Sequence, residues 1–327
     1  MRFSFTAAAL SALVGYSAAH TLVLDLHVNG KSTGDGRSVN GNGSKQYIRS
    51  PPSNSPVKDL KSSDIVCNVN GAKAVTDFVP IAAGDKVTVE WYHNTPGDDI
   101  IDLSHKGPII TYIAPYSETA TGAIWTKISE QGYKNGKWAV ETLVANAGVS
   151  EAVQIPASLK AGKYLIRQEI IAHHESDTTY DVNPARGAQF YPACIQVEVT
   201  GTGSDVPPQN FDFTTGYTYA DPGIHYNLYG ADASTYKIPG PEVWTGGAGS
   251  GSAPAPSSSA AAAQPTTTAA PVASSVAAKP TTLATSVASA APVASSSSAA
   301  APVATPTKAP SAGCKRRRSR KARRSAH

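Results

Sequence analysis

His20 is the first residue that could do chemistry, because it follows Ser17-Ala18-Ala19, a small-residue run typical of a signal-peptidase cleavage site. Cleavage after Ala19 would place an α-amine beside the imidazole, and these two nitrogens could chelate a metal. An α-amine has a pKa of about 8, so it yields its proton to a metal near neutral pH more readily than lysine does. The short pattern alone also allows His20 to follow the cleavage site by accident.

A second imidazole is suggested by His105, in the stretch DLSHKGPIITYIAP. The histidine lies in a polar turn closed by Gly107-Pro108 and followed by an apolar run, where a loop presents a side chain at the edge of a sheet. With His20 it would complete three nitrogen donors, a set that suits Cu(II). No HxxEH spacing or cysteine cluster indicates zinc. A lone histidine in a β domain is more often structural, so His105 gains weight only together with His20.

Tyr191 and Gln189, in GAQFYPACIQVEV, share one face of a predicted strand because they are two residues apart. A tyrosine buried beneath a metal could fill an axial position and keep water away. The alternative is a core tyrosine that is hydrogen-bonded through its hydroxyl.

The elements that must position these residues are β-strands, because apolar and polar residues alternate in several segments and helical periodicity is scarce. The clearest alternation covers residues 86–93 and 195–201, and residues 21–30 and 163–172 read similarly. Turn signals such as NG, PG and DG separate the segments. The sequence predicts an all-β fold, an antiparallel β-sandwich of the immunoglobulin or fibronectin kind with long loops.

Composition divides the 327 residues into four segments. Residues 1–19 are a predicted signal peptide, 20–245 the folded domain, 246–312 a disordered and O-glycosylated linker rich in Ser, Ala, Pro and Thr, and 313–327 a basic tail. No segment reaches about 18 uninterrupted apolar residues, so we expect a soluble protein that is secreted to the extracellular space.

Charge is distributed unevenly between the folded domain and the tail. Residues 20–245 carry 17 basic and 24 acidic side chains, a formal net charge of −7, whereas the tail carries eight basic residues. The tail could bind an anionic polymer, or dibasic-specific proteases could remove it during secretion. For the folded domain we expect a monomer with no nucleic-acid and no membrane partner.

Three cysteines suit a secreted chain with one structural bridge. Cys67 and Cys194 both lie in the folded domain and are the natural pair, and closing so long a loop would contribute about 4 kcal/mol. Cys314, in the tail, is left over and is either free or intermolecular. Asn42-Gly43-Ser44, in a loop rich in Gly and Asn, is a predicted N-glycosylation site.

From His20 to about Trp244 the sequence resembles the fungal lytic polysaccharide monooxygenases of auxiliary activity family 9, formerly glycoside hydrolase family 61. The resemblance rests on an ordered series of motifs: an N-terminal HT, then VNG, IVCN, SHKGP, LIRQEIIAHH, GAQFYPAC, DPGIHYNLY and YKIPGPEVW. So many motifs in the family's order are far more specific than any one of them.

The resemblance implies that His20, through its α-amine and Nδ1, and His105 bind one copper ion, with Tyr191 axial. It also implies that His174 and Gln189 form hydrogen bonds near the open copper face. EIIAHH departs from the family by placing His173 where an apolar residue is usual. Alternation puts His173 and His174 on opposite faces, and we assign the role to His174 from its place in the motif.

The implied reaction is the copper-dependent oxidative cleavage of β-1,4-glucan chains, either cellulose or a hemicellulose, with O2 or hydrogen peroxide as oxidant. An electron donor such as cellobiose dehydrogenase or a small reductant would serve it. Because the reaction is not hydrolysis, a glycosidase's pair of opposed carboxylates is not expected. Tyr217 lies where the family often has an exposed tyrosine and is our expected substrate-binding residue. The alternative function is a non-catalytic secreted protein that binds copper or glycan.

Overall fold

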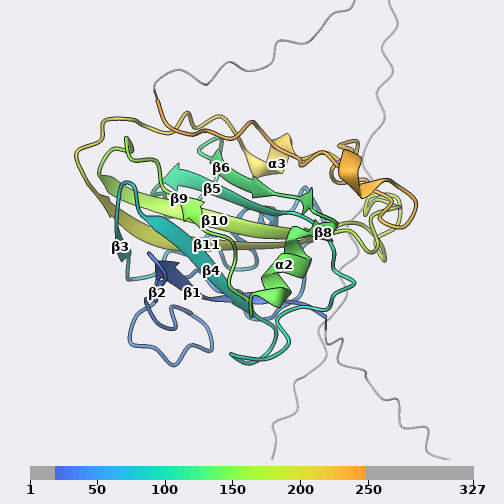
Figure 1. Ribbon diagram of the computed structural model, residues 1–327, viewed down its shortest axis with the longest axis horizontal. Helices are drawn as coiled ribbons and strands as arrows, with labels where there is room; N and C mark the ends of the chain where they lie inside the picture. Colours follow the sequence, from blue (N-terminus) through green and yellow to red (C-terminus); the bar gives the residue numbers. More distant parts are fainter. Residues whose placement is uncertain (1–18, 248–327) are drawn as a thin grey trace, which may run out of the picture. The chain divides into compact units, whose positions relative to one another are not determined.

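The computed structural model describes residues 19–247, which form a β-sandwich of two sheets (Figure 1). The predicted signal peptide, apart from Ala19, nearly all of the linker, the basic tail and Cys314 lie outside the described residues. One sheet has the order β2-β1-β4-β9, with bounds Lys31–Ser32, Leu22–Val28, Lys86–Tyr92 and Val153–Gln154. The other has the order β3-β11-β10-β5-β6, with bounds Val79–Ala82, Gln189–Thr200, Gly162–Ala172, Ile109–Pro115 and Thr126–Gln131.

Strand pairing is antiparallel in both sheets except between β3 and β11, which pair in parallel. The predicted all-β sandwich is therefore confirmed, with one parallel edge pair that the sequence pattern did not indicate. Strands β7 (Tyr133–Lys134) and β8 (Lys137–Trp138) form a separate small ladder.

The main core lies between the two sheets and contains the apolar residues that alternation predicted. Val87, Val89 and Trp91 of β4 are buried there, in the same cluster as Ile195 and Val197 of β11. Hydrophobic burial on these inner faces is what holds the layers together.

A second apolar cluster covers the other face of the five-stranded sheet. Leu165 on β10 and Phe190 on β11 pack there beneath helix α1 (Asp64–Cys67), helix α3 (Phe213–Gly216) and long loops. As a result β10 and β11 are buried on both faces over most of their length. A disulfide between Cys67 and Cys194 joins α1 to β11, in the predicted pairing.

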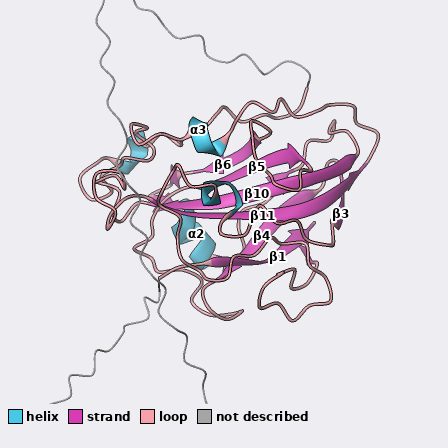
Figure 2. Cartoon of the chain, turned by 180° about the vertical axis from the view of Figure 1, so that it is seen from behind, coloured by secondary structure: helices cyan, strands magenta, loops and turns pink. Residues whose placement is uncertain are grey.

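Short helices and turns occupy the periphery of the sandwich (Figure 2). They include α2 (Ala139–Ala145) and the 3-10 turn η1 (Ala233–Thr235). Within residues 19–247 no helix has the length and apolar character that crossing a membrane would require.

Candidate metal centre

His20, His105 and Tyr191 lie together at one end of the sandwich. Their ring centroids are 5.8 Å apart for His20 and His105, 5.9 Å for His20 and Tyr191, and 6.1 Å for His105 and Tyr191. His20 lies two residues before the start of β1 in the four-stranded sheet, and the intervening Thr21 hydroxyl donates to the Tyr92 carbonyl on β4 at 3.1 Å. Tyr191 belongs to β11 of the five-stranded sheet, so the three rings connect the two layers.

The turn that carries His105 is held by its own backbone and by the end of β10. The His105 N–H donates to the Asp102 carbonyl at 2.9 Å, and the His173 N–H donates to the Lys106 carbonyl at 2.9 Å. A Cβ on Gly107 would lie 1.8 Å from the Ile171 carbonyl oxygen, so only glycine permits this close approach. The position of His105 therefore depends on the contact of Gly107 with β10.

Burial keeps the His105 imidazole neutral. The residue is 2% exposed, and burial, followed by the neighbouring His174 and His20, lowers its pKa to about 3. Its Nε2 atom is buried without a hydrogen-bond partner. Buried polar atoms are rarely unpaired, and a neutral imidazole nitrogen is a common metal ligand, so this atom fits a metal site.

His174, Gln189 and Tyr191 form a hydrogen-bonded row beside His105. The Tyr191 hydroxyl donates to Gln189 Oε1 at 2.6 Å, and Gln189 Nε2 lies 3.2 Å from His174 Nε2. The His174 ring centroid is 4.0 Å from that of His105. Burial raises the pKa of Tyr191 well above its usual value, so the phenol stays protonated.

His173 points away from this row, on the opposite face of the β10 end. Its ring is 1% exposed and packs between Trp138, Tyr226 and Tyr236. Nδ1 lies 2.9 Å from the Ser176 hydroxyl and Nε2 lies 2.9 Å from the Tyr236 hydroxyl. The structure thus brings His174, and not His173, to His105.

The expected role of Tyr217 is wrong, because its side chain is only 3% exposed. Its hydroxyl donates to Glu169 Oε1 at 2.5 Å and lies 2.9 Å from the Tyr112 hydroxyl. Glu169 is fully buried and also pairs with Arg167. A buried carboxylate needs such donors, so Tyr217 belongs to the second apolar cluster and not to a sugar-binding surface.

Tyr229 is the exposed tyrosine of the same C-terminal region, at 77% exposure, whereas Tyr226 is buried at 8%. Asn42 is exposed in its loop, so it is accessible, and its glycosylation stays a prediction.

Comparison with known proteins places these features in a family. The model of "Auxiliary Activity family 9 (formerly GH61)" matches residues 20–236, about two thirds of the chain. The chain belongs to auxiliary activity family 9. Members of this family are copper-dependent lytic polysaccharide monooxygenases, which cleave polysaccharides by oxidation and are generally secreted by fungi. The predicted family and enzyme class are therefore confirmed.

Individual auxiliary activity family 9 proteins are similar over the same region. Lytic polysaccharide monooxygenase A of Collariella virescens is 51% identical over 249 residues, which cover 74% of this chain and 88% of that protein. The enzyme of the same name from Schizophyllum commune is 45% identical, over 72% of this chain and 94% of the relative. The solved structure of CvAA9A is 52% identical with a TM-score of 0.65 and covers 69% of this chain and 98% of its own.

Glu175 is a residue of the candidate metal centre that the sequence patterns did not indicate. Glu175 accepts a hydrogen bond of 3.1 Å from Gln189 Nε2, and its carboxylate lies 3.8 Å from Lys58 Nζ. Its position directly after His174 was the available signal, because a residue next to a site histidine at a strand end stays close to the site.

Proposed function

We propose that this protein is a secreted enzyme that oxidatively cleaves β-1,4-glucan chains, with a copper ion that His20, His105 and Tyr191 would hold. After removal of Ala19, His20 would contribute its α-amine and Nδ1. The observation that carries the proposal is the unpartnered, buried Nε2 of neutral His105 in a cluster with the rings of His20 and Tyr191. Two imidazoles and an amine suit Cu(II).

Bound copper would supply one-electron redox chemistry and the activation of O2 or hydrogen peroxide. The protein side chains hold protons and exclude water. Tyr191, 1% exposed and protonated, closes the inner side of the site against solvent. Burial lowers the pKa of His174, so this ring is neutral and able to accept a proton at neutral pH, and Gln189 fixes it through the 3.2 Å contact.

The polymer would contact the surface around His20 and His105, and we propose Tyr229 in place of Tyr217 as the aromatic contact. A phenol that is 77% exposed can stack on a sugar ring, whereas a buried one cannot. An external reductant, either small or a protein such as cellobiose dehydrogenase, would deliver electrons.

The test is to incubate the mature, copper-loaded protein with ascorbate and with cellulose, xyloglucan, glucomannan or xylan, and to analyse the products by mass spectrometry. Oxidised oligosaccharides are expected from at least one of these four polysaccharides, and none from a His105→Ala variant. Absence of oxidised products from all four substrates would instead support the non-catalytic alternative, a protein that binds copper or glycan.

A further inference from the structure

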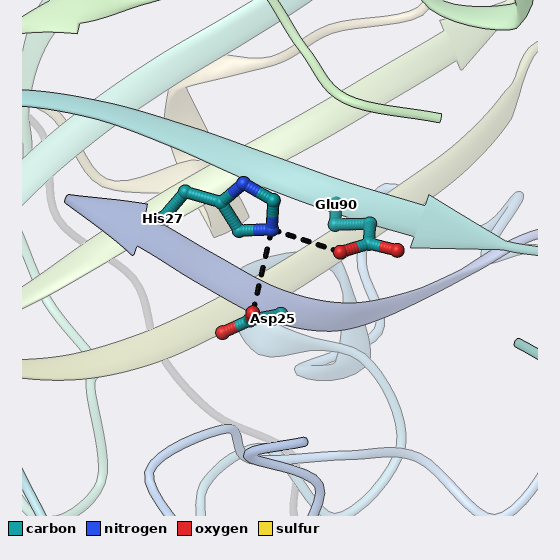
Figure 3. Close-up of side chains that lie close together, drawn as sticks. All are labelled: Asp25, His27 and Glu90. Carbon is teal, nitrogen blue, oxygen red and sulfur yellow. Dashed lines mark hydrogen bonds and ion pairs between the residues drawn. The ribbon is translucent and has the colours of Figure 1, made fainter. Parts of the chain in front are cut away.

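A second group of metal-ligating side chains lies on the four-stranded sheet, away from the copper centre. His27 and Asp25 of β1 and Glu90 of β4 point toward one another in Figure 3. His27 Nε2 is 2.8 Å from Glu90 Oε2 and 3.3 Å from Asp25 Oδ2. His27 is seven residues from His20 along an extended chain, a separation of roughly 23 Å at about 3.3 Å per residue.

An irregularity in β1 brings these three side chains together. Strand β1 is in register with β4 except for a shift between Val23 and Asp25, which leaves Asp25 opposite Glu90. The shift changes the parity of the strand, so that Val23 and Leu26 both enter the core. Asp25 and His27 then share the other face, as residues two apart in a strand do.

Hydrogen bonds hold the Asp25 carboxylate in one orientation. Its Oδ1 accepts from the Tyr47 hydroxyl at 2.6 Å and from the Thr33 hydroxyl at 3.0 Å. Its Oδ2, the oxygen nearest His27, accepts from the Ser32 hydroxyl and from the Gly34 N–H. Such outer contacts orient the carboxylates that ligate metals in proteins.

The cluster carries negative charge that no lysine or arginine balances. Among residues 19–247, the ion pairs of Asp25 and Glu90 are those with His27 alone. Two carboxylates with one imidazole have a net charge of −2 or −1, according to the protonation of the ring. Asp25 is only 2% exposed, and a divalent cation would neutralise the charge of the two carboxylates.

The two distances from His27 Nε2 are close to the ligand spacing around a small transition-metal ion. All three donor atoms lie within 4.8 Å of one another. A tetrahedral zinc ion with bonds of about 2.0–2.1 Å separates its ligand atoms by about 3.3 Å, so the 2.8 Å contact needs to open by only about 0.5 Å. The side chains of His27 and Glu90 are 16% and 27% exposed, which leaves access for a water molecule as fourth ligand.

The one other cluster of this kind among the described residues is His93 with Asp98 and Asp99, and it differs in the exposure of one carboxylate. The Asp99 side chain is 64% exposed. The first cluster is therefore the better metal site.

We propose that Asp25, His27 and Glu90 bind one zinc ion that cross-links β1 to β4. This inference goes beyond the proposed function and does not depend on it. The ion would bind through His27 Nε2, so the proton at that atom would be released.

The experiment is a calorimetric titration of zinc chloride into the mature protein saturated with copper, with the copper EPR signal followed in parallel. We expect one zinc ion per chain and an unchanged copper signal. The affinity should fall at least about 10-fold in both Glu90→Gln and His27→Gln, because each removes one ligand. The matched control is Asp99→Asn, which removes a carboxylate from the other cluster and should leave zinc binding unchanged.

Thermal melting without zinc shows whether Glu90→Gln and His27→Gln fold. If one of them does not fold, the zinc affinity of the other tests the proposal. Repeating the titration with a His105→Ala variant tests whether zinc still binds to Asp25, His27 and Glu90 when a proposed copper ligand is removed. The proposal is overturned if zinc binds only as copper is lost, if the copper-loaded protein binds no zinc, if Glu90→Gln and His27→Gln bind as the unaltered protein does, or if Asp99→Asn abolishes binding.

Discussion

The Tyr191 hydroxyl donates a 2.6 Å hydrogen bond to Oε1 of Gln189, and this bond determines which end of the amide faces the metal centre. With Oε1 engaged, Nε2 is directed to His174 at 3.2 Å and to Glu175 at 3.1 Å. A single buried phenol thus orients the donor group that positions His174.

Gln189→Leu should therefore lower the rate of oxidised-product formation by about 10- to 100-fold, the usual cost of losing a residue that orients groups around a metal. Copper binding should change less, because neither His20 nor His105 is altered. Product chromatography and calorimetry measure the two effects. Gln131→Leu, the same substitution at the end of β6, is the matched control, and equal rates in the two variants would contradict the role of Gln189.

Tyr217→Phe should destabilise the fold by about 1.5–3 kcal/mol, because the buried Glu169 carboxylate loses a hydrogen-bond donor. Denaturant unfolding measures this loss. Binding to cellulose should be unaffected, since the side chain is buried. A variant with unchanged stability and weakened cellulose binding would restore the original expectation for Tyr217.

Tyr229→Ala, unlike Tyr217→Phe, should weaken binding to cellulose and leave the stability of the fold nearly unchanged. Its ring is exposed, so stability should stay within about 0.5 kcal/mol of the original value. Retention on an insoluble glucan should fall by about 2- to 10-fold. This fall corresponds to the loss of an aromatic contact that contributes about 0.5–1.5 kcal/mol. Pull-down isotherms measure retention, and unchanged retention would remove Tyr229 from the proposed surface.

His173 should make the fold sensitive to acid. Burial, with a smaller contribution from His174, lowers its pKa to about 3 from the about 6.5 of an unfolded chain. Below pH 6.5 the unfolded state therefore binds a proton that the native state excludes. The free energy of unfolding keeps its full value above pH 6.5 and decreases as the pH falls toward 3.

Comparison with a His173→Leu variant isolates this effect. The Ser176 hydroxyl can still donate to the Tyr226 carbonyl, and the Tyr236 hydroxyl can still donate to the Gly223 carbonyl. Neither hydroxyl is therefore left without a hydrogen-bond partner in the variant. Between pH 7 and pH 4.5 the original protein should lose about 2–3 kcal/mol more free energy of unfolding than the variant does. Parallel pH profiles for the two proteins would show that His173 is not buried in its neutral form.

Retention of Ala19 should abolish tight copper binding while the fold persists. The His20 nitrogen would then be an amide, and loss of one chelating donor should weaken affinity on the order of 100-fold or more. Calorimetry on the mature and extended proteins, with melting curves as the control, measures the difference. Equal affinities would show that the α-amine is not a ligand.

Sequence patterns predicted the strands that have one buried and one partly exposed face. In β4, Val87, Val89 and Trp91 are buried while Thr88 and Glu90 are half-buried, so alternation is plain. In β10 both faces are buried, and charged residues such as Arg167 and Glu169 lie inside because they pair with each other. No local pattern reports such pairing.

The error at Tyr217 has the same origin, since its partner Glu169 is 48 residues away in the chain. The cluster of Asp25, His27 and Glu90 depends on a register shift in β1, which a strict two-residue alternation does not predict. His174, Gln189 and Tyr191 lie in only two motifs, LIRQEIIAHH and GAQFYPAC, and were the easiest group to assemble from sequence.

The centre has its groups in both layers, with His20 leading into one sheet and Tyr191 within the other. The spacing between these residues therefore depends on how the two sheets pack against each other. A cavity made far from the site, for example by Ile195→Ala in the shared core, would let the layers relax toward each other and alter copper affinity with every ligand intact. Engineering the interior of this protein is therefore also engineering of its metal chemistry.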